Sequence, residues 1–475
     1  MLMSPVFHSS RLLAPVRSLF IAVALCVTGQ VSAAAPDLTT GGVPTDNDQW
    51  NLGPSGMAGW CYRDGQATAN ARQFLVRSVA GGSPAAGIMA VNDVILGASG
   101  TGADPVNFTL DARIAFAQAI TDAEERNPAT LKILRWRAGV TSIESLTLET
   151  LGAYSATAPY NCPKSAAILE KGIQWMVNTN ADDGNWRYSA LTLLAANDPA
   201  NPNNAARQAK ATTELRQLIL SPETIALFTS GKSITDGNIA KPWHIGPKLI
   251  ALSEYYLHTV KIGAPDPEVL PSIRAYAHCI ANGQSMFGTC GHYFTNPGFR
   301  NAPVNGPYNI GYGPINNAAI PCYIGLVLAN KCGLTDPEIL AGIERAGTFY
   351  AQYTHNGCAG YGEHGPYGGN DTNGKAGLQA LAFQFEGDRP VETKFYAKSS
   401  TAAAIAERDI GHTGSFFAFL YAPLGANVGG PDAMAAYFRE TKWMYELARR
   451  WDNPLFPFPD RLRSVFSALD EKANS

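Results

Sequence analysis

The stretch DDGNWRYSALTLLAAN (Asp182–Asn197) joins a loop containing glycine and tryptophan to a run rich in alanine and leucine. The same order, a loop with glycine and aromatic residues followed by an apolar helix-like run, recurs at irregular intervals along the chain. The other copies read GNIAKPWHIGPKLIALSEYYL (Gly237–Leu257), INNAAIPCYIGLVLAN (Ile315–Asn330), GYGEHGPYGGNDTNGKAGLQALAF (Gly360–Phe383) and IGHTGSFFAFLYAPLGA (Ile410–Ala426). Each copy, with an amphipathic helix before it, predicts one helical hairpin.

Repeated hairpins of this kind predict a ring of helices. A hairpin that cannot bury its own inner face is stable only when it packs on its neighbours. The repeats therefore predict an all-α domain over residues 160–452 in the form of an α/α toroid, in which Gly and Ala let the inner helices approach one another. The second helix of each hairpin, the inner one, is expected to begin near Ser189, Pro247, Ile320, Gly374 and Gly414.

A segment at the first of these helices carries a family resemblance. KGIQWMVNTNADDGNW (Lys171–Trp186) closely resembles the QW repeat of terpene cyclases, and GTFYAQYTHNGCAGY (Gly347–Tyr361) keeps its spacing in degenerate form. In that family the repeat ties the hairpins together, so the resemblance implies the toroid fold and no activity. The acidic motif of the cyclases and the zinc ligands of protein prenyltransferases have no match here, and we expect neither a metal nor another cofactor.

Residues 51–140 predict a small α+β domain ahead of the helices. RQFLVRSVA (Arg72–Ala80) and LKILRW (Leu131–Trp136) have the composition of β-strands. Between these two segments, apolar residues recur at helical spacing and predict one amphipathic helix. These residues are Leu110, Ile114, Ala117 and Ile120.

The connector VAGGSPAAGIMAVNDVILGASG (Val79–Gly100) resembles the middle of a PDZ domain, with Asn92 where such domains usually have glycine. The resemblance implies that GMAGWCY (Gly56–Tyr62) is the loop whose backbone N–H groups hold the C-terminal carboxylate of a bound peptide. The alternative is a PDZ-like domain that only docks on its neighbour, with its groove filled from within the chain. The peptide-binding positions would be Gly59, Trp60 and Cys61.

The first residues of the chain predict export. Arg11 and Arg17 precede the apolar run LFIAVALCVTG (Leu19–Gly29), and VSA (Val31–Ala33) supplies the small residues of a cleavage site. We therefore expect a signal peptide over residues 1–33, a linker over 34–50, and a secreted or periplasmic protein without a membrane span in its mature chain. A Pro-rich tail, residues 453–475, follows the helices.

The amino-acid composition limits the classes of molecule that the protein is expected to bind. Hydrophobic residues make up 46% of the chain, charged residues 16%, and the net charge is −3. No basic stripe is available to neutralise phosphates, so we do not expect a nucleic-acid partner.

Seven cysteines follow the predicted signal peptide. In an oxidising compartment, Cys279 with Cys290 and Cys322 with Cys332 are the nearest pairs in sequence, and buried reduced thiols are the alternative.

The order of motifs carries a second resemblance, which covers most of the mature chain. A PDZ-like domain followed by GYGEHGPY, NGKAGL and GHTGSFF looks like a family of secreted bacterial proteins of unknown function. This resemblance identifies relatives without assigning an activity.

The polar loops ahead of the inner helices are expected to meet at the mouth of the ring. Secreted α/α toroids often act on polysaccharides, so the fold implies a carbohydrate-active lyase or hydrolase. A lyase needs a base and a group that neutralises a uronate carboxylate, whereas a hydrolase needs two carboxylates, such as Glu363 with Asp371. The candidate catalytic residues are Tyr361, Glu363, His364 and His412, and the candidate substrate-binding residues are Asn373, Lys375 and Trp186.

Each candidate also has a structural alternative. Asp371 and Asn373 are suited to capping the helix that begins near Gly374. His364 is equally suited to bonding backbone carbonyls in its loop, and the aromatic candidates to packing. The alternative function is a non-catalytic scaffold that binds a peptide C-terminus or a glycan.

Overall fold

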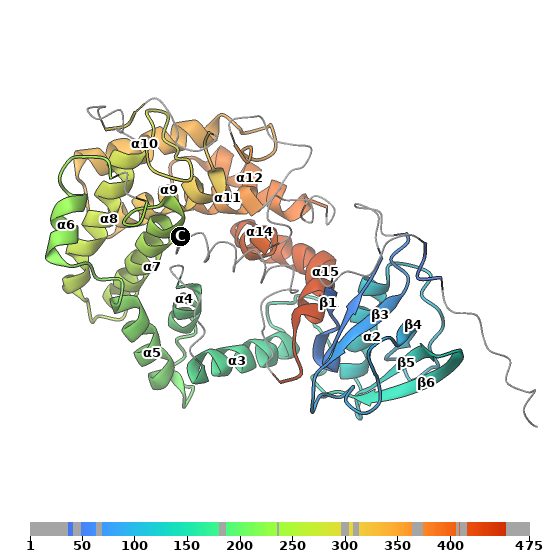
Figure 1. Cartoon of the computed structure of the whole chain (residues 1–475). Helices are drawn as coiled ribbons and strands as arrows, with labels where there is room; N and C mark the ends of the chain where they lie inside the picture. The colour runs from blue at the N-terminus through green and yellow to red at the C-terminus, as the bar shows by residue number, and fades with distance from the viewer. Residues whose placement is uncertain are drawn as a thin grey trace, which may run out of the picture.

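A computed structural model describes residues 37–40, 49–62, 69–179, 187–234, 237–295, 304–306, 313–362, 374–404, 408 and 416–452. Within these residues the chain forms a six-stranded antiparallel sheet with one helix, and then a long helical region (Figure 1). No described helix is long and apolar enough to cross a membrane.

The strands lie in the sheet in the order in which they occur in the sequence. The last two strands form the longest ladder, from Thr130 opposite Thr147 to Arg137 opposite Val140. The 3-10 turn η2 follows the first strand, and helix α2 lies between the fourth and the fifth. The elements are β1 (Gln49–Asn51), η2 (Gly53–Ser55), β2 (Met57–Trp60), β3 (Phe74–Val79), β4 (Val94–Ser99), α2 (Ala112–Glu124), β5 (Thr130–Arg137) and β6 (Val140–Thr147).

Helix α2 is confirmed, but its predicted apolar face is partly wrong. Asp111 is the N-cap, and its carboxylate accepts a hydrogen bond from the backbone N–H of Arg113 at 2.9 Å. Leu110 therefore lies before the helix and is 74% exposed. Phe116 and Ile120 lie on the buried face. The helix begins at Ala112, two residues after Leu110, so Leu110 does not join the buried face, and Ile114 of the predicted face is 45% exposed.

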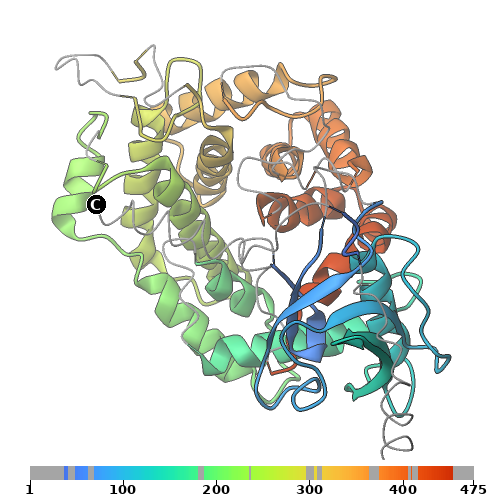
Figure 2. The same cartoon turned by 45° about the vertical axis from the view of Figure 1, so that its right-hand side comes forward.

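The helical region consists of paired helices. Its elements are α3 (Pro163–Asn178), α4 (Tyr188–Ala195), α5 (Asn204–Arg216), α6 (Pro222–Phe228), α7 (Pro242–Lys261), η3 (Pro267–Val269), α8 (Leu270–Gly283), α9 (Asn316–Lys331), α10 (Pro337–Ala351), α11 (Lys375–Glu386), α12 (Pro390–Ala402), α14 (Phe416–Val428) and α15 (Pro431–Ala448). From α3 to α15 they follow one another along an arc that returns to the sheet, as the two views show (Figures 1 and 2).

The predicted inner helices correspond to α4, α7, α9, α11 and α14, and we keep the name inner helices for these five. The largest error in a predicted start is five residues, at α7, which begins at Pro242 and not at Pro247. Helix α9 likewise begins four residues early and contains Pro321. Proline is most common in the first turn of a helix, so the prediction placed each helix start close to its proline. In the structure both prolines lie inside their helices.

Each inner helix contacts the next along the arc: α4 contacts α7, α7 contacts α9, α9 contacts α11, and α11 contacts α14. The hydroxyls of Tyr188 in α4 and Tyr421 in α14 lie 3.1 Å apart and share a hydrogen bond. In α9, every residue from Asn316 to Ala329 is buried.

Small residues allow this close packing, as the sequence predicts. A methyl group added at Gly377 of α11 would lie 2.2 Å from the backbone oxygen of Tyr421 in α14. A methyl group at Gly246 of α7 would lie 2.9 Å from the backbone nitrogen of Cys322 in α9. The backbones of neighbouring inner helices therefore touch at positions that only glycine can occupy without displacement.

We expect Gly377→Ala to destabilise the chain by about 1–3 kcal/mol, because α11 and α14 must separate to make room for the methyl group. Urea unfolding of the full chain measures the change. Gly81→Ala is the control, since an added methyl group there meets no atom within 4 Å. Equal stabilities for the two variants would contradict the packing that we describe.

The sheet and the last helices share one hydrophobic core. Trp443, Met444 and Leu447 of α15 pack with the buried residues of the sheet and α2. The guanidinium of Arg113 lies 4.7 Å from the ring centroid of Trp50 and 5.6 Å from that of Trp443. The N-terminal domain is thus joined to the end of the helical region by a continuous apolar interface.

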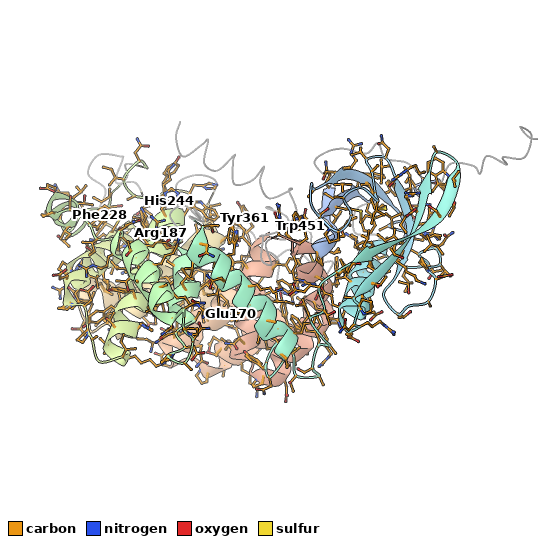
Figure 3. All side chains as sticks on the ribbon, turned by 90° about the horizontal axis from the view of Figure 1, so that it is seen from below. Glu170, Arg187, Phe228, His244, Tyr361 and Trp451 are labelled. Atoms are coloured by element: carbon orange, nitrogen blue, oxygen red, sulfur yellow. The ribbon has the colours of Figure 1, made fainter. Side chains whose placement is uncertain are left out.

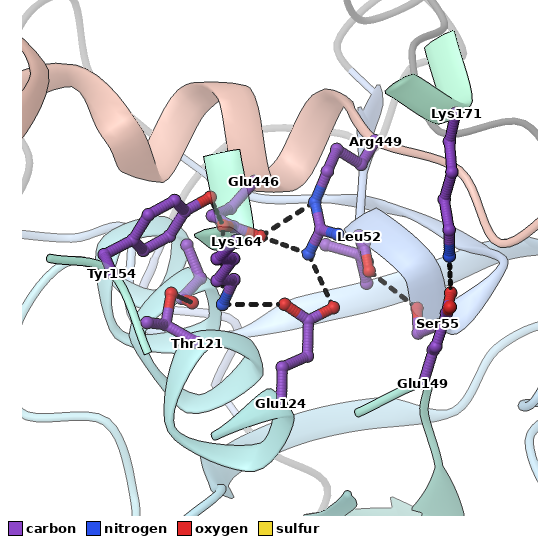
Figure 4. A network of polar contacts seen from close by, with 11 residues as sticks. Leu52, Ser55, Thr121, Glu124, Glu149, Tyr154, Lys164, Lys171, Glu446 and Arg449 are labelled. Carbon is purple, nitrogen blue, oxygen red and sulfur yellow. Dashed lines mark hydrogen bonds and ion pairs between the residues drawn. The ribbon is translucent and has the colours of Figure 1, made fainter. Parts of the chain in front are cut away.

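A buried ion cluster lies at the same junction (Figure 4). The ammonium of Lys164 in α3 lies 2.9 Å from the carboxylate of Glu124 in α2. Arg449 at the end of α15 pairs with Glu124 at 2.6 Å and also with Glu446. Tyr154, in the segment between the sheet and α3, donates its hydroxyl to Glu446. Two carboxylates and two cations balance in charge, and they hold the first and last helices of the helical region against α2.

The seven cysteines that follow the predicted signal peptide are buried and unbridged. Of the two alternatives left open by the sequence, the structure has reduced thiols. Burial raises the pKa of the Cys279 and Cys290 thiols well above the ordinary value.

Candidate functional site

Half-buried polar side chains gather where the inner helices begin. Arg187 is the N-cap of α4, with a positive φ of 53°, and His244 lies in the first turn of α7. Tyr361 lies in the segment that leads toward α11, and its backbone oxygen accepts from the N–H of Asn316, the first residue of α9, at 3.3 Å. Figure 3 shows Arg187, His244 and Tyr361 near one edge of the helical region.

An indole–imidazole pair lies at the same ends of the helices. Nε1 of Trp243 donates to Nδ1 of His292 at 3.0 Å. An imidazole nitrogen that accepts a hydrogen bond carries no proton, so this bond selects the neutral tautomer with its proton on Nε2. The pair therefore fixes both the orientation of the His292 ring and the position of its proton.

Aromatic rings continue from this pair across the helices. Trp243 stacks on Phe417 of α14 with ring centroids 5.9 Å apart. Phe417 stacks in turn on Tyr421 at 5.7 Å, and the hydroxyl of Tyr421 meets that of Tyr188. The row joins α7, α14 and α4, so Trp243 contributes to packing as well as to the orientation of His292.

Two cations lie beside one another between α4 and α7. Nη2 of Arg187 donates to Oε1 of Gln217 at a long 3.4 Å, and its buried Nε has no hydrogen-bond partner. Lys248 follows His244 by one turn of α7. Burial, and then the positive charge of Arg187, lower the pKa of the Lys248 ammonium. Like charges at short range raise the free energy of both groups.

Glu254 is a carboxylate further along α7. It lies eleven residues after Trp243, which is close to three turns, so the two side chains share one face of the helix. Burial raises the pKa of the Glu254 carboxyl above its usual range.

Among the described residues, no group of three or more His, Cys, Asp or Glu side chains is placed to hold a metal ion.

The comparison with known families assigns the helical region. A family described as Domain of unknown function (DUF6288) matches residues 165–456, which is more than half of the chain. The chain belongs to this family. The match begins inside α3 and ends after α15, so the DUF6288 domain coincides with the helical region and leaves the sheet outside it. No curated protein and no solved structure matches the chain.

Most of the predicted site of the DUF6288 domain lies outside the described residues. This holds for Glu363, His364, His412, Asn373 and Trp186. Tyr361 is half-buried among the groups at the starts of the inner helices. Lys375 is the first residue of α11 and is 1% exposed. An ammonium that is buried at the positive end of a helix needs an acceptor or an anion nearby to be stable.

The three predicted peptide-binding positions lie in or directly after β2 of the N-terminal domain. Gly59, Trp60 and Cys61 are all buried. Gly59 is opposite Trp50 of β1 on one side and Val76 of β3 on the other, and Trp60 is likewise paired on both sides. An added peptide strand needs an open edge. The pairing therefore favours the alternative in which the groove is filled from within the chain.

Sequence reasoning did not single out Arg187, Lys248 or Glu254. Arg187 directly follows the QW-like loop, which draws attention to Trp186 instead. His244 and Lys248 are four residues apart, a spacing that predicts a shared helix face once α7 is placed. That α4 brings Arg187 to this face depends on how the DUF6288 domain packs, which neither segment specifies alone.

Proposed function

We propose that this chain is an exported carbohydrate-active enzyme, a polysaccharide lyase or a glycoside hydrolase, acting where the inner helices of the DUF6288 domain begin. The indole–imidazole pair carries the proposal. A neutral imidazole that is held by a partner and keeps its proton on Nε2 is oriented to donate a hydrogen bond to substrate. His244 and Tyr361 supply side chains for proton transfer nearby.

The proposed architecture is an α/α toroid. It is supported by the successive contacts of the inner helices and by the hydroxyl pair of Tyr188 and Tyr421, which links the last inner helix to the first. The QW-like segments support it as well. Tyr350 in the second of them donates to the side-chain oxygen of Asn316 at 3.1 Å, and its own backbone oxygen accepts from Tyr396 at 2.9 Å. One residue thus ties together α9, α10 and α12.

The N-terminal domain is proposed to be PDZ-like. Asn92, at the position where such domains usually have glycine, has a positive φ of 71°. Asparagine tolerates this conformation better than other non-glycine residues, so the departure from the PDZ pattern has a physical reason. The next residue, Asp93, is buried and pairs with Arg137 at 2.6 Å. Because β2 is paired on both sides, we assign this domain a docking role.

A panel of neutral and acidic polysaccharides tests the proposed activity. Incubation with the purified chain is expected to produce new reducing ends, with unsaturated uronates as well if the enzyme is a lyase. We expect Trp243→Phe to lower the turnover by roughly three- to tenfold, since it removes one hydrogen bond worth about 1 kcal/mol and keeps an aromatic ring in place.

Trp136→Phe is the matched control. This indole lies in β5 of the N-terminal domain, and its replacement is expected to leave turnover unchanged. If none of the polymers is cleaved, or if both variants retain full turnover, the proposed site is wrong.

A further inference from the structure

We propose that Arg187 and Lys248 form a subsite for a carboxylate of an acidic polysaccharide, the uronate class, bound where α4 and α7 meet. This inference rests on the proposed carbohydrate activity and names its substrate class. Nothing in the family match assigns a ligand to either residue.

The two side chains are brought together by the contact between α4 and α7. Arg187 projects from the cap of α4, and its neighbour Tyr188 is fixed by the hydroxyl of Tyr421. Lys248 is one turn from His244, so both residues share one side of α7, and the charge of Arg187 at the cap of α4 acts on Lys248. Figure 3 shows both Arg187 and His244 at the same edge of the helical region.

No carboxylate balances this pair in the part of the chain that the structure describes. Lys248 interacts electrostatically with Arg187 and with no acidic residue there. Arg187 has one long hydrogen bond to Gln217, and its Nε is buried without an acceptor. By contrast, the buried ammonium of Lys164 pairs with the carboxylate of Glu124. A bound anion would relieve the repulsion and supply the missing acceptor.

A carboxylate fits the geometry of these donors and the groups beside them. A guanidinium binds a planar carboxylate through two parallel N–H groups, and an ammonium adds a point charge. Neutralising a uronate carboxylate also makes the hydrogen on the adjoining ring carbon more acidic. His244 and Tyr361, which Figure 3 shows near the same edge of the helical region, are side chains of the type that removes such a proton.

The lyase step that follows is balanced without an oxidant or water. The base takes the proton from the ring carbon that bears the carboxylate. The released electron pair forms a double bond to the next ring carbon as that carbon's bond to the glycosidic oxygen breaks. The oxygen leaves with a proton donated by an acid, and the two products are a new chain end and an unsaturated uronate.

Calorimetry of the full chain at low ionic strength tests the subsite. The probes are tetramers of galacturonate, glucuronate and mannuronate, each compared with its own methyl ester. We expect at least one acid form to bind about tenfold or more tightly than its ester, since charge-assisted hydrogen bonds are stronger than neutral ones. This comparison uses the wild-type protein and does not depend on the folding of a variant.

Variants then locate the effect. Arg187→Gln and Lys248→Met are each expected to weaken binding of the acid form about tenfold and to leave binding of the ester unchanged. Lys261→Met, at the far end of α7, is the control and is expected to bind like the wild type. Asp182→Asn with Asp183→Asn tests whether loop carboxylates occupy the subsite, in which case their removal would strengthen binding of the acid form at least tenfold.

The outcomes separate the two proposals. Acid and ester binding with equal affinity would overturn the uronate subsite and leave the carbohydrate activity standing. Strengthened binding in the Asp182→Asn/Asp183→Asn variant would also overturn the subsite, because Arg187 and Lys248 would then be binding partners of the loop carboxylates. Cleavage of neutral polymers alone would have the same consequence. If no polymer is bound or cleaved, both proposals fail together.

Discussion

Lys164→Met is expected to lower the free energy of unfolding of the full chain by about 3–5 kcal/mol, the usual cost of removing one partner from a buried ion pair. The side chain of Lys164 is 0% exposed and that of Glu124 is 1% exposed. Without the ammonium, Glu124 and Glu446 would share only Arg449 as a counter-ion. Their burial would then disfavour both charges, and burial already raises the pKa of Glu124 above its ordinary value.

Chemical unfolding of wild type and variant measures this loss. Lys171→Met is the matched control in the same helix, because Lys171 pairs with Glu149 on the surface and its side chain is 38% exposed. Exposed pairs contribute roughly 0.2–1 kcal/mol. Adding Glu124→Gln to Lys164→Met should recover part of the stability, since Arg449 and Glu446 then remain as a balanced pair. Equal losses for the two lysine variants would show that the buried cluster does not stabilise the junction.

The ion cluster also explains how the helical region meets the N-terminal domain. Lys164 is in the first turn of α3, and Arg449 follows the last helix, so the two ends of the DUF6288 domain converge on α2 (Figure 4). A loss of Lys164 should therefore loosen both ends at once, and we expect one cooperative unfolding transition for the wild type.

The repeated hairpins were predictable because their signal is local. Each inner helix has a glycine and aromatic loop followed by a long apolar run, and these features need no knowledge of distant residues. The starts of α7 and α9 were misplaced because Pro247 and Pro321 lie inside the helices, where proline is unusual. Tertiary packing tolerates them there.

The ion cluster and the cation pair were not predictable for the opposite reason. Arg449 and Glu124 are 325 positions apart, and nothing in either segment identifies the other as its partner. Likewise, nothing in the sequence distinguishes Lys248 from an ordinary helical lysine, and only the packing of α4 on α7 brings the charge of Arg187 near it. Burial converts such residues from surface charges into strongly interacting groups, and burial is a property of the whole fold.

His364→Ala is expected to lower turnover by about 10²–10⁴-fold, the usual contribution of a positioned acid or base, with a melting temperature close to that of the wild type. The loop that holds His364 has more titratable side chains than the other loops ahead of inner helices. Its described ends, Tyr361 and Lys375, both lie at the starts of inner helices. We therefore expect His364 to serve a site shared with His292 and Tyr361.

Turnover per folded molecule separates this role from a structural one. His355→Asn is the control, because His355 is an exposed imidazole earlier in the same connection between α10 and α11, with a positive φ of 73°, which asparagine tolerates. If His364 instead bonds backbone carbonyls, its removal strands those groups, costs roughly 1–3 kcal/mol of stability and leaves specific activity intact. A His364→Ala variant that melts at a lower temperature but keeps normal specific activity would show that His364 stabilises the structure and is not the catalytic base. Tyr361 and His244 would then remain as the candidate bases.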